Sequence, residues 1–228
     1  MTAPVQTAGA DLADISRAAD ARRLAVLGGF HAGSGTPNLP PGTATVLLLG
    51  PAEPGFWMAV NSTPEFRDGC PDPLDRWSRR TIGEIAARFD AVPLFPFDGP
   101  PYRPFVSWLI ESGRAWMSPV SLLVHADAGL FLSVRGALAF RQSLTLPAAS
   151  ERPCESCAAQ PCRDACPVGA LRPDGYDVAA CHQFLATDAG SDCMRLGCAT
   201  RRTCPVSQRY PRDPAQSAFH MRAFHETP

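Results

Sequence analysis

The cysteines constrain this 228-residue chain more than any other feature, because eight of the nine lie between residues 154 and 204. The first four follow the pattern C-x2-C-x4-C-x3-C-P, and the last four end in a second Cys-Pro step. Two thiolates two residues apart can face one metal centre from a single turn of chain, and a Cys-Pro step is typical of chains that bind [4Fe-4S] clusters. The sequence therefore predicts two [4Fe-4S] clusters, with these metal ligands: Cys154, Cys157, Cys162, Cys166, Cys181, Cys193, Cys198 and Cys204.

The order of these cysteines also predicts how they are shared. In two-cluster ferredoxins the cysteine that precedes proline binds the other cluster. Crossed ligation would assign Cys154, Cys157, Cys162 and Cys204 to one cluster, and Cys166, Cys181, Cys193 and Cys198 to the other.

A pair of four-cysteine zinc sites is the alternative interpretation. Such sites usually repeat C-x2-C across a longer spacer. Only one C-x2-C occurs here, and two Cys-Pro steps favour iron-sulfur clusters. Cys70 lies far away in the sequence, and we expect a loop or buried thiol there rather than a ligand. Arg163, Arg195, Arg201 and Arg202 lie near the cysteines, where they either shift a reduction potential or are solvated surface residues.

Composition excludes several other functions. With 45% apolar and 19% charged residues and a net charge of -1, the chain is typical of a globular protein without the basic field that binds a polyanion, so nucleic acid is not expected as the main partner. No lysine is present, which removes Schiff-base chemistry and the lysine of a phosphate-binding loop.

The N-terminal sequence does not resemble a secretory signal, and the longest apolar run, residues 44–50, is far shorter than the roughly 20 residues of a membrane helix. We therefore expect a soluble, cytoplasmic protein without a membrane partner. Thiols stay reduced in that compartment, so the cysteines are better interpreted as metal ligands than as disulfides.

Apolar periodicity predicts an α+β fold. After a flexible tail, residues 1–10, we expect a layered α/β domain over residues 11–148 and a ferredoxin-like domain over residues 149–228. The predicted helices cover 11–24, 72–89 and 105–112, and the predicted strands cover 24–30, 43–49, 91–97, 120–125 and 130–140. The last two strands are expected to form a hairpin around residues 126–129.

Residues 121–138 with a central Gly129, followed directly by the first cysteine set, by Asp177-Val-Ala-Ala-Cys181 and by a last Cys-Pro step, resemble epoxyqueuosine reductase. Related reductive dehalogenases contain similar modules, and the resemblance covers roughly residues 72 to 206. It implies a reduced nitroreductase-like N-terminal domain that binds a corrinoid (cobalamin), to which the clusters deliver electrons. Longer ligand loops, a shorter chain and the missing basic field argue against the tRNA-modifying reaction itself.

Two residues are candidates for a corrinoid pocket, His125 at the end of an apolar run and Arg135 on the next strand. A core or loop histidine is the commoner interpretation of His125, and Arg135 is equally ambiguous. The aromatic and proline-rich residues 95–108 either cover a flat macrocycle or form a packed loop. His220 and His225 are expected to be exposed on a polar C-terminal helix.

These observations predict an iron-sulfur oxidoreductase that passes electrons through two clusters to a corrinoid or similar ligand. A redox partner protein or a small electron donor would supply the electrons. The alternatives are a ferredoxin-type carrier whose N-terminal domain docks a protein partner, a non-enzymatic cobalamin chaperone, and a zinc-stabilised scaffold.

Overall fold

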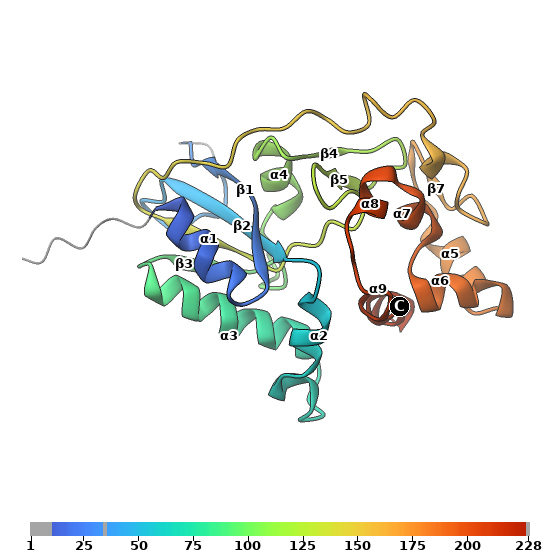
Figure 1. The fold of residues 1–228 in the computed structure, drawn as a ribbon, viewed down its shortest axis with the longest axis horizontal. Coiled ribbons are helices and arrows are strands. Elements are labelled where there is room, and N and C mark those ends of the chain that lie inside the picture. Colours follow the sequence, from blue (N-terminus) through green and yellow to red (C-terminus); the bar gives the residue numbers. More distant parts are fainter. Residues whose placement is uncertain (1–10, 34–35, 227–228) are drawn as a thin grey trace, which may run out of the picture.

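A computed structural model describes residues 11–33 and 36–226, so the predicted tail, residues 1–10, lies outside the described residues. The chain is a mixed α+β fold, as predicted, with a sheet and its helices on one side and a group of short helices on the other (Figure 1). No helix within the described residues is long and apolar enough to cross a lipid bilayer.

The main sheet has four antiparallel strands in the order β1-β2-β6-β3. Their bounds are Leu24–His31 for β1, Thr45–Pro51 for β2, Val92–Leu94 for β3 and Gly136–Phe140 for β6. Every residue of β2 and β6 is buried, and Leu47 pairs with Leu138 across the two strands. A strand that is buried at every position has cover on both faces of its sheet.

The alternation of side chains along β2 supplies two cores, one on each face. Leu47 and Leu49 pack with helices α1 (Leu12–Asp20), α2 (Phe56–Asn61) and α3 (Pro73–Arg88). Val46 and Leu48 face the opposite core, which contains Trp108 of helix α4 (Phe105–Glu111). Figure 1 shows α1 and α3 on one side of the sheet and α4 on the other. A short turn of 3-10 helix, η1 (Pro64–Phe66), precedes α3.

The predicted hairpin around residues 126–129 is wrong. Strand β5 (Leu123–His125) pairs with β4 (Ala115–Met117), a strand that the apolar pattern did not indicate, and β6 pairs with β2 and β3 instead. The reason is burial, because all five residues of β6 are inaccessible and need partners on both edges and cover on both faces. A tight turn, closed by His125 and Gly129, separates β5 from β6.

The cysteine-rich part consists of short elements, grouped on the right of Figure 1. They are η2 (Pro161–Arg163), β7 (Leu171–Arg172), β8 (Gly175–Tyr176), α5 (Val178–Leu185), η3 (Asp188–Gly190), α6 (Ser191–Leu196), α7 (Ala199–Thr203), α8 (Pro205–Arg209) and α9 (Pro214–Glu226). Residues 143–152, which contain no helix or strand, lead into this part along the top of the figure, and Arg114 Nη1 donates to Ala148 O at 2.8 Å.

Contacts join the two parts of the chain at several places. A third core places Val124 and Leu130 against Leu171 and Val206 of the cysteine-rich part. Phe219 of α9 lies 5.0 Å, centroid to centroid, from the ring of Trp57 in α2. The amino-acid composition changes at residue 148, but side chains on either side of this position pack against each other. The predicted domain boundary therefore stays a prediction.

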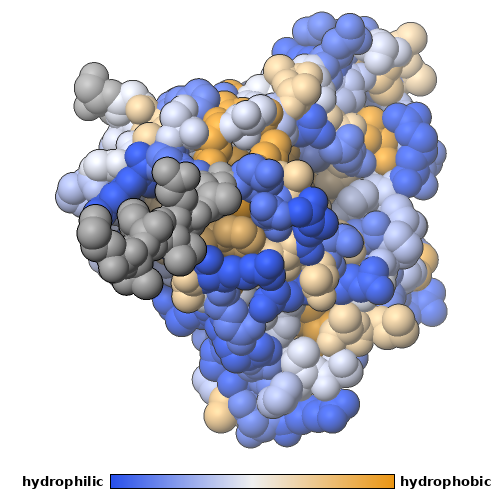
Figure 2. Space-filling view, turned by 60° about the vertical axis from the view of Figure 1, so that its left-hand side comes forward, coloured by the Kyte–Doolittle hydropathy of each residue, from blue (hydrophilic) through white to orange (hydrophobic). Residues whose placement is uncertain are grey.

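Hydrophilic residues cover most of the face seen in Figure 2, with hydrophobic residues in small patches between them. The apolar side chains of the two main cores are thus largely covered on this side. The exposed apolar residues that matter below belong to α4 and β4, where Val106 and Met117 are 56% and 42% exposed.

Candidate metal centres

The eight clustered cysteines line two separate cavities. Four of them surround a cavity of about 520 Å³, namely Cys154, Cys157, Cys162 and Cys204. The other four surround a cavity of about 340 Å³, namely Cys166, Cys181, Cys193 and Cys198. We call these the first and the second cysteine site. The grouping is the one expected for crossed ligation, because Cys166 and Cys204 each leave the set in which they stand in the sequence.

Electrostatic coupling between the thiols follows the same division. Burial raises the pKa of Cys154, and the neighbouring Cys162 and Cys204 raise it further. Burial also raises the pKa of Cys181, with additional increases from Cys198 and Cys166. A thiol with a raised pKa is a poor anion on its own, and a positive centre inside the cavity would favour the thiolate form.

The local backbone structure places Cys162 and Cys204 in the wall of the first site. Cys162 lies in the 3-10 turn η2, and Cys204 stands at the junction of α7 and α8, where extended backbone turns the chain back toward the first site. Both side chains are buried, and Leu130 and Val206 complete the apolar side of this wall. The charged residues of the wall are Glu151, Arg152 and Arg209, of which Glu151 and Arg209 are exposed.

Several donors surround the second site. Ala170 N donates to Cys166 Sγ at 3.2 Å, and the hydroxyl of Tyr176 is hydrogen-bonded to Cys181. Arg201 Nη1 donates to Leu130 O at 2.5 Å.

Arg212 enters the same wall from the segment that precedes α9, and its Nη1 donates to Phe131 O at 3.1 Å. Both Arg201 and Arg212 are thus held by backbone carbonyls, which are neutral acceptors.

The donor set fits a multi-atom iron-sulfur cluster. Each cavity has a volume of hundreds of cubic ångströms, and four thiols from separate segments form part of each wall. Thiolates are the ligands of [4Fe-4S] clusters, and hydrogen bonds to sulfur and nearby charges set their potentials. Within residues 11–33 and 36–226, no group of three or more His, Cys, Asp or Glu side chains is placed to hold a single metal ion.

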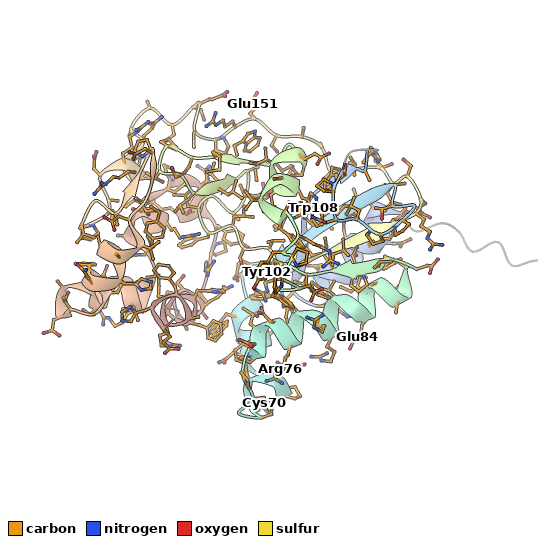
Figure 3. All side chains as sticks on the ribbon, turned by 180° about the vertical axis from the view of Figure 1, so that it is seen from behind. Cys70, Arg76, Glu84, Tyr102, Trp108 and Glu151 are labelled. Atoms are coloured by element: carbon orange, nitrogen blue, oxygen red, sulfur yellow. The ribbon has the colours of Figure 1, made fainter. Side chains whose placement is uncertain are left out.

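Cys70 lies apart from both sites. It is exposed in the loop before α3, where its backbone N–H donates to Asp68 Oδ1 at 2.9 Å and its carbonyl accepts from Arg76. Figure 3 shows Cys70 and Arg76 at the tip and base of this loop, on the opposite side of the molecule from the loop with Glu151. The loop placement matches the prediction for Cys70.

His125 and Arg135, the predicted corrinoid contacts, are both engaged by the protein itself. His125 is 1% exposed, its Nε2 lies 2.7 Å from Leu27 O, and its Nδ1 accepts from the N–H groups of Asp127 and Ala128. Burial lowers its pKa, so the ring is neutral at neutral pH. Arg135 Nε donates to Ser78 Oγ at 3.0 Å and its Nη2 pairs with Asp75.

Neither residue lines either cysteine site or the third cavity described below. A role in corrinoid binding thus stays a prediction that these contacts do not favour. The more common interpretation of His125, a histidine satisfied within the core, agrees with its hydrogen bonds.

A third cavity of about 330 Å³ lies between α4 and the β4–β5 pair. Phe105, Val106 and Leu109 of α4 form one wall, and Met117, Ser121 and Leu123 belong to the other. Leu122, Leu132 and Arg201 line both this groove and the second cysteine site, so the two are adjacent. We call it the α4 groove, and neither its walls nor its position were predicted from sequence.

Four arginines near the cysteines were ambiguous in the sequence, and the structure separates them. Arg163 and Arg195 are exposed, and Arg202 pairs with Asp192. Only Arg201 among these four lines a described cavity. His220 was expected to be exposed but is partly buried in the wall of the second site, and His225 is partly buried too. The reason is that α9 packs against α6 and the aromatic group of α2 instead of standing free.

Comparison with known proteins adds no assignment. No family model matches the chain, and neither a curated protein nor a solved structure matches it significantly.

Proposed function

We propose that the protein is an iron-sulfur oxidoreductase that holds two [4Fe-4S] clusters and passes electrons to a ligand next to the second cysteine site. The observation that carries the proposal is the pair of cavities, each walled by four cysteines of one crossed set. Spacing alone predicts the same two sets. Cys204 shares the first cavity with Cys154, whereas Cys198 lines the second, although Cys198 lies nearer to Cys204 in the sequence.

Each part of the site has a definite task. The thiolates of the first set would hold one cluster and those of the second set the other, and a cluster of this kind supplies one-electron transfer. Cys162, Cys193 and Cys204 are buried, so little water reaches their sulfur atoms. Hydrogen bonds from Ala170 N and Tyr176 stabilise negative charge at the second site.

The α4 groove is the proposed place for the electron acceptor. It is largely apolar, opens beside exposed Val106 and Met117, and shares Arg201 with the second site. An apolar groove with few polar groups suits a flat, largely apolar ligand. A corrinoid is the first ligand to test, because of the sequence resemblance; His125 and Arg135 would not contact it in the groove, and Val106, Leu109 and Met117 would.

Iron and acid-labile sulfide analysis of anaerobically purified protein tests the clusters. We expect two clusters per chain in the parent protein and in a Cys70→Ala control, and about half of that iron in Cys204→Ala and in Cys166→Ala. Crossed ligation makes a sharper prediction about which half is lost. Cys204→Ala should give the spectrum of Cys154→Ala, and Cys166→Ala should give that of Cys193→Ala. Zinc without sulfide, or unchanged iron in all four variants, would exclude the proposal.

Titration with cob(II)alamin, followed by electron paramagnetic resonance, tests the acceptor. A saturable change in the cobalt signal is expected, and Val106→Asp should weaken binding at least tenfold, about 1.4 kcal/mol, because it places a charge in the apolar wall. Val92→Asp is the matched control, since Val92 is 43% exposed on β3 and lies outside the groove. No cobalt change with both clusters present would favour the alternative of an electron carrier that docks a protein partner.

A further inference from the structure

The walls of the two cysteine sites differ in charge, and the difference concerns residues that no sequence pattern assigns. The wall of the second site contains Arg201 and Arg212 and no carboxylate. The wall of the first site contains Glu151 beside Arg152 and Arg209.

We infer that Arg201 and Arg212 give the second cysteine site the higher reduction potential, so that an electron shared between the sites resides next to the α4 groove. This inference rests on the proposed function, since it requires a redox centre in each site.

The two guanidinium groups are hydrogen-bonded to neutral acceptors, so their positive charge is not offset by a bound carboxylate. Their hydrogen bonds go to the carbonyl groups of Leu130 and Phe131, which position the charge without neutralising it. The ion pairs formed among the described residues include neither arginine. The carboxylate that acts on Arg212 at longer range is Glu53, whose Oε2 accepts from Phe56 N at 3.3 Å.

The pKa values of Arg212 and His220 also reflect the positive charge of this wall. Burial, together with the charge of Arg201, lowers the pKa of Arg212 to about 10. Burial, together with the charges of Arg212, Arg135 and Arg201, lowers the pKa of His220 to about 3. His220 is therefore neutral at neutral pH, and the two arginines supply the positive charge of this wall.

Reduction of a cluster adds one negative charge, and a nearby cation stabilises the reduced form more than the oxidised form. Solvent weakens this effect. The wall of the first site has more exposed residues than the wall of the second. They are Glu151, Ser156, Ala158, Ala159, Pro205 and Arg209. At the second site the exposed members of the wall are Pro167, Val168 and Tyr176. The two hydrogen bonds to Cys166 and Cys181 act in the same direction as the arginines.

Redox titration monitored by electron paramagnetic resonance tests the order of the two potentials. Dithionite is the one-electron reductant, and the second site is assigned by repeating the titration in Cys154→Ala, which retains it. We expect the second site to be reduced first. Arg201→Met and Arg212→Met should each reduce its equilibrium constant for reduction about tenfold, a shift of about 59 mV to more negative potential. The first site should shift less.

Three controls separate charge from structure. Arg212→Lys keeps the charge and should restore most of the potential, whereas a role in packing or hydrogen bonding alone would not be restored in this way. Arg222→Met removes an exposed arginine of α9, the helix that follows Arg212, and should shift neither site. Arg201 and Arg212 lie in different segments, so a folding defect in one methionine variant leaves the other as a test.

The outcomes distinguish this inference from the proposed function. Absence of iron and sulfide in the parent protein would overturn the proposed function. Two intact clusters with the first site reduced before the second would overturn the inference alone. An unchanged second-site potential in both methionine variants, or an equal shift of both sites, would also overturn it.

Discussion

Residues 11–140 and residues 154–226 bury very different amounts of apolar side chain. The largest fully buried side chains, among them Trp108, Phe56 and Phe140, all precede residue 141. The later region buries only small or single apolar groups such as Ala170, Leu171 and Leu185, together with three cysteines. Burial of apolar area is the main force that stabilises folded chains. The sheet region therefore has hydrophobic cores to stabilise it, whereas the cysteine-rich region would, under the proposed function, depend on the two clusters for its stability.

Anaerobic removal of iron with a chelator should produce the largest difference in stability between the two regions. Binding free energies at metal centres of small domains amount to roughly 10 kcal/mol or more, and they count as folding free energy because the unfolded chain has no preformed site. We expect amide hydrogen exchange in residues 154–210 to become fast, while β1 and β2 remain protected. Equal loss of protection in both regions would contradict the comparison.

Leu48→Ala should destabilise the sheet region by about 2–5 kcal/mol, because it removes a fully buried side chain from β2 and leaves a cavity. Urea unfolding followed by tryptophan fluorescence measures the change. Iron per folded chain should stay at the parent value, which shows that the two regions are stabilised separately. Met58→Ala is the control, since Met58 is 74% exposed and its loss should change stability little.

Glu65→Gln should reduce the stability of the sheet region by about 1.5–3 kcal/mol at neutral pH, because Glu65 forms a charge-assisted hydrogen bond at 2.6 Å with Arg80 Nε. This hydrogen bond lowers the pKa of Glu65 from 4.5 to about 2. The folded chain thus binds fewer protons than the unfolded chain between these values. The contribution of this hydrogen bond to the free energy of unfolding is complete above pH 4.5 and is lost as the pH falls toward 2.

Unfolding of the parent and of Glu65→Gln at several pH values checks this sign. The difference in free energy of unfolding between the parent and Glu65→Gln should be constant above the ordinary carboxyl pKa and should become smaller below it. Glu84→Gln is the control, because Glu84 pairs with Arg80 at 3.3 Å but is 48% exposed, and exposed pairs contribute little. A difference that grows on acidification would exclude the assigned role of Glu65.

Gly129→Ala should have the smallest effect of the four, about 1–3 kcal/mol, and it acts where the two regions meet. Gly129 has a φ of +57°, and a Cβ there would lie 2.5 Å from Ser207 N. Ser207 Oγ accepts from Leu130 N at 2.8 Å, so the clash would disturb a hydrogen bond between the regions.

Exchange of the Leu130 amide measures that loss directly. Gly69→Ala provides the control, since Gly69 also has positive φ, +72°, but no atom lies within 4 Å of the added Cβ. Equal effects of the two substitutions would show that backbone strain alone is responsible and that the contact with Ser207 is unimportant.

Sequence reasoning succeeded where a local pattern suffices to define an element. The helical spacing predicted over 72–89 corresponds to α3, Pro73–Arg88, and the apolar runs gave β1 and β2 within two residues at each end. It failed where pairing is not local. Strand β6 joins β2 from far away in the sequence, and no property of residues 130–140 alone distinguishes that partner from the neighbouring β5. Strand β3 is shorter than predicted, Val92–Leu94, and it ends two residues before Pro96, which has no N–H group to donate to a neighbouring strand.

The candidate sites show the same limit. Cysteine spacing predicted the two sets that line the two cavities, because a predicted set of metal ligands depends only on residue type and order in the sequence. Arg212 and His220 belong to the second wall for another reason, the packing of α9 against α6, which leaves no short motif in the sequence. The α4 groove likewise arises where α4, the β4–β5 pair and Leu132 meet, and each segment by itself is an ordinary apolar stretch.

The crossed arrangement of the cysteines has a consequence for the order in which a growing chain completes its sites. Synthesis from the N-terminus begins the first set at Cys154, but that set remains incomplete until Cys204 is added. The second set begins later, at Cys166, and is complete once Cys198 has been added. The site that starts first thus closes last, and a growing chain that ends between residues 198 and 203 carries three thiols of the first set and all four of the second. Cluster delivery to a nascent chain would therefore meet a finished second site before a finished first one.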